Sequence, residues 1–375
     1  MVAKNWVSRF PGIENRAYMA NCSQGPLSVD VQEALADYMH GWLEKGNPWD
    51  EWMEAVGNAS SAFALLIRAK REEVCPTFTV SNALSEILSC FDFSKKNEIV
   101  ISDSDFPSTT TVALAQERRG CKVRIVSSRN GKCALDDYEK SISDKTLMVI
   151  LCEVTSYNGF KHDARAMAEI AHSKGAMLFV DSYQSAGNSV IDVKRSDADF
   201  LAAGTQKYLL GIPGSAYLYV REDLIQTLEP SFTGWFSQRD PFKFGRTKTE
   251  YAPDANRFQS GTWSVASHYA ANAGIKIIME VGDRVVQDHT TRLTGYLLER
   301  LNEHELTPLN IFDESERGAL VSIKVPNSHS VEEQLRKYRI HTSARGDGIR
   351  FALHFFNTKE DIDKGLKTLQ KVLKD

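Results

Sequence analysis

Long apolar runs, targeting signals and repeats are absent from this sequence of 375 residues. The longest uninterrupted apolar run is LMVILC at residues 147–152, which is far too short to cross a bilayer. The first residues, MVAKNWVSRFPG, contain no apolar core and no cleavage site of a secretory signal. No internal repeat or low-complexity segment is visible. We therefore expect a cytoplasmic globular protein that has no membrane partner.

Several common site signatures are also absent. The net charge of −4 is spread along the chain with no basic stripe, which argues against a nucleic-acid partner. The six cysteines have no C-x-x-C spacing and the nine histidines no H-E-x-x-H spacing, so we expect reduced buried thiols and no metal site. The sequence has no P-loop motif and no G-x-G-x-x-G motif after a strand, which excludes a P-loop protein and a dinucleotide-binding protein.

What the sequence does contain is an alternation of short apolar strands and amphipathic helices. The composition, 42% hydrophobic and 25% charged, suits a large core and leaves room for a second, smaller domain. We predict strands at 97–102, 122–127, 147–153, 176–181, 199–204 and 215–220, and helices at 28–45, 50–70, 110–120 and 164–174. Asp163 is expected to cap the last of these helices, and Gly175 to follow its end. The pattern predicts an α/β protein whose mostly parallel sheet is covered on both faces.

The carboxyl-terminal part has a different pattern. Residues 236–262 are polar and aperiodic, and a segment of this kind inside a compact protein is usually functional. After it come a helix at 281–302 and strands near 320–325 and 349–354. We place a domain boundary at residue 262, with an amino-terminal arm and a large domain at 1–262 and a small α+β domain at 263–375.

A lysine and an aspartate are the candidates for chemistry. Lys207 lies among small and apolar residues in FLAAGTQKYLLGIPG, either at a loop edge or as a desolvated amine with a lowered pKa. Asp181 ends the predicted strand 176–181, where ligands of such sheets bind, although it could also cap a helix. A carboxylate that protonates a pyridine nitrogen, with a lysine that forms a Schiff base, is what pyridoxal phosphate requires.

With VDSYQSAGN, GTQKYLLGIPGSAYLYV and IRFALHFFNT, the sequence resembles the class V aminotransferase family of fold-type I pyridoxal-phosphate enzymes, over nearly its whole length. The family includes cysteine desulfurases, kynureninases and relatives of isopenicillin-N epimerase. The resemblance implies the fold of that group, a large domain with a mostly parallel sheet and a smaller carboxyl-terminal domain. It also implies that Lys207 forms the Schiff base with pyridoxal 5'-phosphate and that Asp181 is the partner of the pyridine nitrogen.

The resemblance implies further cofactor-binding residues. Phe106 would stack on the cofactor ring and Gln184 would face its phenolic oxygen; alone, Phe106 would be read as core. The expected phosphate-binding residues include Thr79 and Val80 at a helix amino terminus, and Gln206 and Thr205 beside the lysine. Two more, Trp235 and Thr262, would reach the phosphate from a neighbouring subunit, which implies a homodimer with shared active sites.

An arginine carries the substrate prediction. Arg350 matches the residue that binds the substrate α-carboxylate, and its planar guanidinium suits bidentate binding; the alternative is a surface salt bridge. Arg345 lies nearby in TSARGDG and is expected to assist. Asn21, Ser23 and Gln24 fall in the segment that lines the substrate pocket in relatives. The implied substrate is a small molecule, an α-amino acid.

Two departures from the family narrow the reaction. The loop RIHTSARGDGIR contains no cysteine, which argues against a desulfurase that forms a persulfide on the protein. Gln238 stands where kynureninases have a histidine after their Gly-Trp pair, which argues against a kynureninase. An aminotransferase, an epimerase and a lyase that needs no protein thiol remain, and we favour the aminotransferase. Retention of Lys207, Asp181 and Arg350 argues against a non-catalytic homologue.

Overall fold

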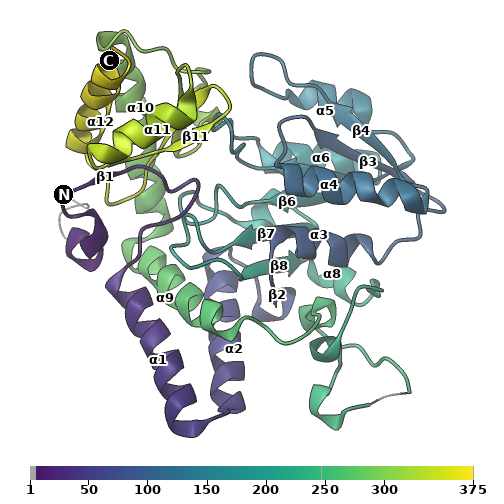
Figure 1. The fold of residues 1–375 in the computed structure, drawn as a ribbon. Coiled ribbons are helices and arrows are strands. Elements are labelled where there is room, and N and C mark those ends of the chain that lie inside the picture. The colour runs from purple at the N-terminus through teal and green to yellow at the C-terminus, as the bar shows by residue number, and fades with distance from the viewer. Residues whose placement is uncertain (1–5, 246, 375) are drawn as a thin grey trace.

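A seven-stranded sheet forms the centre of the computed structural model, which describes residues 6–245 and 247–374 (Figure 1). Its strands are β2 (Val74–Thr77), β3 (Glu98–Ser102), β4 (Lys122–Val126), β5 (Thr146–Cys152), β6 (Met177–Asp181), β7 (Phe200–Gly204) and β8 (Ala216–Val220). They lie in the order β2-β8-β7-β6-β5-β3-β4. Strands β3 to β7 run parallel, which confirms the predicted mostly parallel sheet.

The exception to parallel order is strand β8, which is antiparallel to both β7 and β2. Residues 205–215 join β7 to β8, and this connection is too short for the crossover that parallel neighbours require. Lys207 lies on this hairpin loop. Sequence reasoning missed β2 because Pro76 cannot donate a hydrogen bond to a neighbouring strand. In the described sheet β2 lies at the edge, with β8 as its one neighbour, and a proline is tolerated in an edge strand.

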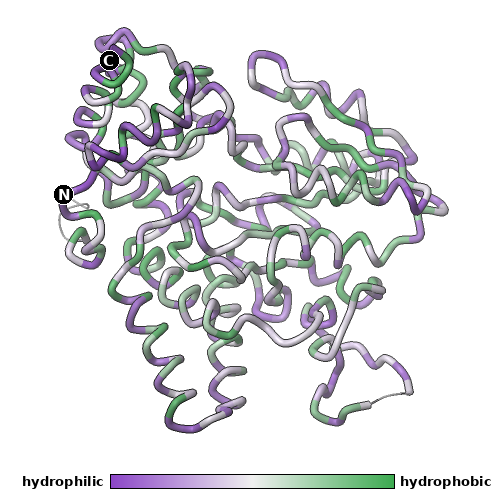
Figure 2. Tube along the Cα trace, in the orientation of Figure 1, coloured by the Kyte–Doolittle hydropathy of each residue, from purple (hydrophilic) through white to green (hydrophobic). Residues whose placement is uncertain are grey.

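Helices cover both faces of the sheet, as predicted, because alternate side chains of each strand point to opposite faces. Leu178 and Val180 of β6 join the core cluster of Met167, whereas Phe179 between them joins that of Leu84. The first face carries α2 (Trp49–Leu66), α5 (Leu135–Ser141), α6 (Ala164–Ser173) and α9 (Val265–Val281). The second carries α3 (Val80–Leu88), α4 (Pro107–Ala115) and α8 (Glu222–Ile225). In Figure 2 the hydrophobic colour gathers along the central strands.

Most predicted helices are present with small shifts of their ends. Helix α1 (Val29–Lys45) and α2 form a projecting hairpin, and α9 packs along both (Figure 1). Asp163 caps α6 by accepting hydrogen bonds from the N–H groups of Arg165 and Ala166. The helix predicted at 110–120 is α4 followed by a 3-10 turn, and Gly120, with a φ of 90°, ends it.

The carboxyl-terminal part has its own small core. Strands β9 (Leu320–Lys324), β12 (Gly348–Ala352) and β11 (Ser343–Arg345) form an antiparallel sheet. Its helices are α10 (Asp283–Glu303), α11 (Ser328–Lys337) and α12 (Lys359–Val372). The predicted α/β fold with a smaller α+β part is thereby confirmed. The boundary at residue 262 stays a prediction, because α9, which follows it, packs on α1 and α2.

Two very short strands connect the amino-terminal segment to the small carboxyl-terminal part. Strand β1 (Ala17–Tyr18) pairs in parallel with β10 (Ile340–His341), which brings the amino-terminal segment to the small core. The remaining helix is the single turn α7 (Val193–Ser196). All six cysteines are free thiols. In the part of the chain that is described, no helix combines the length and the apolar character that a membrane span would need.

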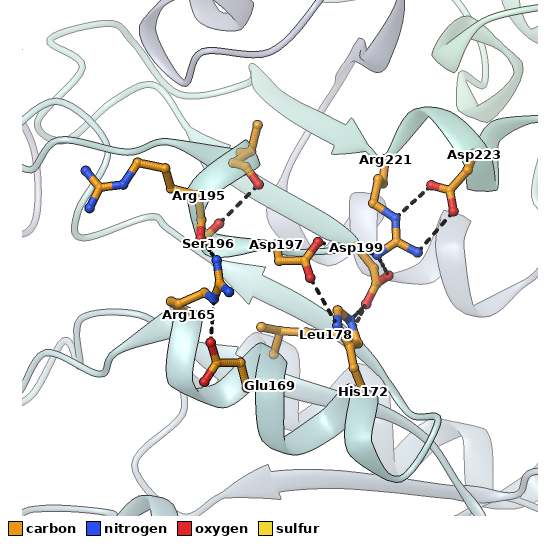
Figure 3. Close-up of polar contacts among 11 residues, drawn as sticks. Arg165, Glu169, His172, Leu178, Arg195, Ser196, Asp197, Asp199, Arg221 and Asp223 are labelled. Atoms are coloured by element: carbon orange, nitrogen blue, oxygen red, sulfur yellow. Dashed lines mark hydrogen bonds and ion pairs between the residues drawn. The ribbon is translucent and has the colours of Figure 1, made fainter.

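A buried carboxylate pins the amino-terminal ends of β6 and β7 (Figure 3). Asp199, only 1% exposed, accepts a hydrogen bond from the N–H of Leu178 and lies 2.8 Å from Arg221 Nη1 and 2.8 Å from His172 Nε2. The hydrogen bond to Asp199 raises the pKa of His172 above its ordinary value of 6.5, although partial burial opposes the shift. The protonated form of His172 therefore stabilises the fold.

We predict that His172→Gln destabilises the protein in a pH-dependent way. Because the pKa of His172 is raised in the folded state, its contribution is fully present below pH 6.5 and is lost as the pH rises through the folded-state value. The free energy of unfolding should fall by about 1–2 kcal/mol at pH 6 and by much less at pH 9, as expected for a hydrogen bond to a charged group. Urea unfolding of His172→Gln and of the exposed-site control His329→Gln measures this. A loss that is equal at both pH values would contradict the prediction.

Candidate active site

The carboxyl-terminal ends of the parallel strands gather ionisable side chains at one edge of the sheet. Asp181 is the last residue of β6, Glu153 follows β5, and Asp105 lies just beyond β3. Lys207 follows β7 at the same edge. This is the edge at which open α/β sheets bind ligands, so the predicted position of Asp181 and Lys207 agrees with the fold.

Lys207 is buried without a counter-ion. It is 9% exposed, and within the described residues its amine forms no ion pair. Desolvation lowers the pKa of Lys207, and the charge of Asp181 partly opposes this shift. The backbone of the loop is held closely: the N–H of Gly25 donates to Gln206 O (2.8 Å), and a Cβ on Gly274 of α9 would meet Leu209 O at 2.3 Å. An amine held in this way can serve as a nucleophile near neutral pH.

Two aromatic rings flank the lysine amine. Lys207 Nζ lies 5.4 Å from the ring centroid of Phe106, which precedes α4, and 4.2 Å from that of Tyr183. Tyr183, which sequence reasoning missed, lies across Gly204, where a Cβ would meet its Cζ at 2.1 Å; only a glycine therefore admits the ring there. The Tyr183 hydroxyl donates to Gln206 Oε1 (3.2 Å). The adjacent glycine in AAG is the signal that could have suggested a bulky neighbour.

Burial raises the pKa of two carboxyl groups at this edge, those of Asp181 and Asp105. Asp181, 2% exposed, accepts a hydrogen bond from the Tyr183 N–H (3.0 Å), and burial raises its pKa to about 6. Asp105, also missed, accepts hydrogen bonds from the N–H groups of Ser102 (2.8 Å) and Cys152 (3.1 Å). Burial raises the pKa of Asp105 to about 7, and the charge of Asp181 adds to this shift.

The amino-terminal segment and the loop after β6 contribute amide groups. Gln184 Nε2 donates to Cys22 O (3.0 Å) and Asn21 Nδ2 donates to Ala352 O (2.7 Å). The side-chain oxygens of both residues are buried and have no hydrogen-bond partner among the residues that the structure describes. Gln24 Nε2 donates to Gly211 O (3.2 Å) in the Lys207 loop, whereas Ser23 is exposed. A buried amide oxygen without a hydrogen bond is a costly arrangement that a bound polar group would relieve.

The residues expected at the phosphate lie in two environments. Thr79 caps α3 by accepting a hydrogen bond from the Asn82 N–H (3.1 Å), and Val80 is the first helical residue. The first N–H groups of a helix have no partner within it, so this end can hold an anion. Thr205 is fully buried, and its hydroxyl contacts Ser215 Oγ (2.8 Å) inside the hairpin. The phosphate roles of Thr79, Val80, Thr205 and Gln206 stay predictions.

Trp235 and Thr262 lie apart from these residues. Trp235 Nε1 donates to Pro241 O (2.6 Å), and its ring packs on Trp49 and Phe244. Thr262 is exposed. Among the described residues, neither side chain makes a hydrogen bond or ring contact with Lys207, so their contact with a phosphate, made from a neighbouring subunit, stays a prediction.

Arg350 belongs to the small sheet and contacts a residue of the large part of the chain. It is 2% exposed; Nη1 donates to Ser156 O (2.7 Å), Nη2 to Ser343 Oγ (2.6 Å), and Nε to Ser343 O (3.3 Å). All three acceptors are neutral, and within the described residues no carboxylate pairs with Arg350. The surface salt bridge considered as an alternative is absent, and the positive charge remains available to a ligand carboxylate.

A cleft of about 550 Å³ opens beside this arrangement. Its walls come from both parts of the molecule and carry mostly polar side chains. They include Asp103, Ser104, Asp105, Ser128, Thr155, Ser156, Tyr157, Asn158, Asn310 and Arg345. The described residues contain no group of three or more histidine, cysteine, aspartate or glutamate side chains suited to a metal.

The site residues fit pyridoxal phosphate. A buried amine of lowered pKa, a carboxylate at a strand end and a flat aromatic ring match the aldehyde, the pyridine nitrogen and the ring of that cofactor. The capped amino terminus of α3 suits its phosphate, and the unpartnered oxygen of Gln184 marks a polar position that the fold leaves open.

Comparison with known proteins agrees with this arrangement. Residues 31–364 match the family described as Aminotransferase class-V. The chain is 36% identical to an uncharacterized aminotransferase of Bacillus subtilis (strain 168), over 94% of this chain and 93% of that protein. It is 26% identical to a kynureninase of Bacillus cereus (strain ATCC 10987 / NRS 248), over 99% and 92%.

A solved structure shares the fold. The apo cysteine desulfurase of Thermococcus onnurineus NA1 superposes with a TM-score of 0.87 at 22% identity, over 100% of this chain and 98% of that one. The family match covers most of the sequence, from the start of α1 into α12. The chain therefore belongs to the class V aminotransferase family of pyridoxal-phosphate-dependent enzymes.

Proposed function

We propose that this protein is an aminotransferase that acts on an α-amino acid through Lys207. The observation that carries the proposal is the buried, unpaired Lys207 amine between two aromatic rings, on the same sheet edge as Asp181. A relative that is 36% identical over almost the whole chain is named an aminotransferase, which supports the same choice.

Each residue has a separate task in the proposed reaction. When bound, pyridoxal phosphate supplies a ring that stabilises negative charge on the substrate Cα. The lowered pKa of Lys207 leaves a free amine that can attach the cofactor and then carry a proton to or from Cα. Asp181 would hold a proton on the ring nitrogen, and Arg350 would orient the substrate through its α-carboxylate.

A lyase that cleaves at Cβ is the second candidate, because kynureninases and cysteine desulfurases are among the similar proteins. The thiols whose charge would act on the Lys207 amine are those of Cys22 and Cys152, which are 1% and 3% exposed. Neither lies on the loop before Arg350. Appearance of a new amino acid from an added 2-oxo acid supports the aminotransferase, whereas release of a side-chain fragment with no 2-oxo acid added supports the lyase.

We further propose a homodimer with shared sites. Among the described residues, Trp235 makes no hydrogen bond or ring contact with Lys207 of its own chain, and Phe242 and Phe244, whose rings pack on Trp235, are 43% and 60% exposed. In the proposed dimer, Trp235 of the partner subunit would reach the phosphate. Gel filtration with light scattering tests whether the protein is a dimer. We also propose that the protein is located in the cytoplasm.

Lys207→Ala should abolish covalent attachment of the cofactor and turnover while leaving the fold intact. Borohydride reduction of the native protein, followed by peptide mapping, should place the phosphopyridoxyl label on Lys207. The control Lys145→Ala, at an exposed site, should keep both the label and the activity. A label on another lysine, or turnover by Lys207→Ala at the native rate, would contradict the assignment.

Arg350→Met should weaken substrate binding by about 2–5 kcal/mol, because truncating one member of a desolvated charged pair leaves the other member unpaired. Arg350→Lys should recover little, since an ammonium group lacks the planar fork. KM and kcat for each variant, with Arg336→Met as a surface control, measure the effect. Circular dichroism and cofactor content should match the native protein; an unchanged KM in such a folded, loaded variant would refute the role of Arg350.

A further inference from the structure

Arg345 extends from the same face of the small sheet as Arg350. In the antiparallel pairing of β11 with β12, Ser343 lies opposite Arg350 and Arg345 opposite Gly348. Residues directly opposite each other point to one face, and residues two apart on a strand share a face. Both guanidinium groups therefore leave the sheet toward the active site. Arg345 Cζ lies 6.0 Å from the ring centroid of Phe106.

The guanidinium of Arg345 is not engaged by other polar groups. Within residues 6–245 and 247–374 it makes no hydrogen bond and no ion pair, and its one described contact is with Phe106. Arg350 differs, since three hydrogen bonds hold it in place. Arg345 thus presents five N–H donors and a full positive charge at the mouth of the site.

Arg345 and a residue that contacts Arg350 line the same cleft. Arg345 lines the cleft of about 550 Å³, and so does Ser156, whose carbonyl accepts the hydrogen bond from Arg350 Nη1. Phe106 lies between the lysine and Arg345, at 5.4 Å from Lys207 Nζ and 6.0 Å from Arg345 Cζ. A small molecule that reacts at Lys207 and is held by Arg350 can therefore extend its far end toward Arg345.

The two carboxylates on the cleft wall already have partners. Asp103 accepts the Ser128 N–H through both of its oxygens at 3.0 Å. Asp105 accepts the N–H groups of Ser102 and Cys152. Neither forms an ion pair with Arg345 among the described residues. Backbone N–H groups thus hold both carboxylates within the cleft wall, whereas the exposed guanidinium of Arg345 is free to turn toward a ligand and would attract an anionic group.

We propose that Arg345 binds a second anionic group, on the side chain of the substrate. The substrate class is then an α-amino acid with a side-chain carboxylate or a similar anion, together with the matching 2-oxo acid. This inference rests on the proposed function, in which Arg350 binds the α-carboxylate. A guanidinium suits the role because its planar fork matches carboxylate and phosphate geometry.

The test is binding of unreactive five-carbon acids to the cofactor-loaded enzyme by titration calorimetry. Glutarate carries two carboxylates, valerate carries one, and 5-(trimethylammonio)valerate carries one carboxylate and a terminal quaternary ammonium group, which cannot form a Schiff base with the cofactor. Glutarate should bind about tenfold more tightly than valerate, the effect of one charge-assisted contact of about 1.4 kcal/mol. Arg345→Met should remove this preference and leave the affinity for valerate unchanged. The control Lys337→Met, an exposed change on α11 outside the cleft, should alter neither.

The remaining outcomes separate this inference from the proposed function. A preference for glutarate that survives in Arg345→Met, or tightest binding of 5-(trimethylammonio)valerate, overturns the inference. Equal affinity of the native enzyme for glutarate and valerate also overturns it. Arg350→Met should weaken both acids; if it weakens neither, the proposed role of Arg350 fails, and the Arg345 result is still read from the glutarate-to-valerate ratio. Tighter binding of 4-phosphonobutyrate than of glutarate, lost in Arg345→Met, would support a phosphate as the side-chain anion.

Discussion

The burial of an amine without a counter-ion is the constraint on which the active site depends. Lys207 is 9% exposed and has no carboxylate within ion-pair distance among the described residues, so its charged form is disfavoured. The fold keeps it there through a short hairpin between β7 and β8, held by the Gly25 N–H and packed closely against α9 at Gly274. The charge of Asp181 acts on the Lys207 amine, but within the described residues the two side chains form no ion pair. Both groups therefore remain available to a cofactor that binds between them.

The site also depends on contact between the two parts of the molecule. Arg350 belongs to the small sheet, but one of its three acceptors, Ser156, follows β5 of the large sheet. The amino-terminal segment makes the same connection, since Asn21 donates to Ala352 and Gln184 donates to Cys22. Because Arg350 belongs to the small sheet and Lys207 follows a strand of the large one, small relative movements of the two cores would change the distance between the arginines and Lys207.

The sequence predicted the parts of the fold that follow from the pattern of hydrophobic residues. Strands 97–102, 176–181 and 199–204 are continuous apolar runs, and their carboxyl ends locate Asp181 and Lys207. Strand β2 was not predicted because Pro76 is disfavoured in a strand unless the strand is at an edge, and edge position depends on the order of the whole sheet. Tyr183 was missed because its contact with Lys207 depends on Gly204 lying beneath its ring. The absence of a partner for Arg345 is likewise a fact of three-dimensional structure, whereas the motif around Arg350 identified that residue from sequence.

The two ends of the sheet have different roles, and this separation bears on how the protein can be modified. The ion cluster of Asp199, His172 and Arg221 lies at the amino-terminal ends of β6 and β7 (Figure 3). Asp181 and Lys207 lie at or beyond the carboxyl-terminal ends of the same two strands. Effects of substitutions at well-separated sites without shared partners usually add. Thermostability could therefore be engineered at one end of β6 and β7 while substrate range is altered at the other, with little interference between the two sets of changes.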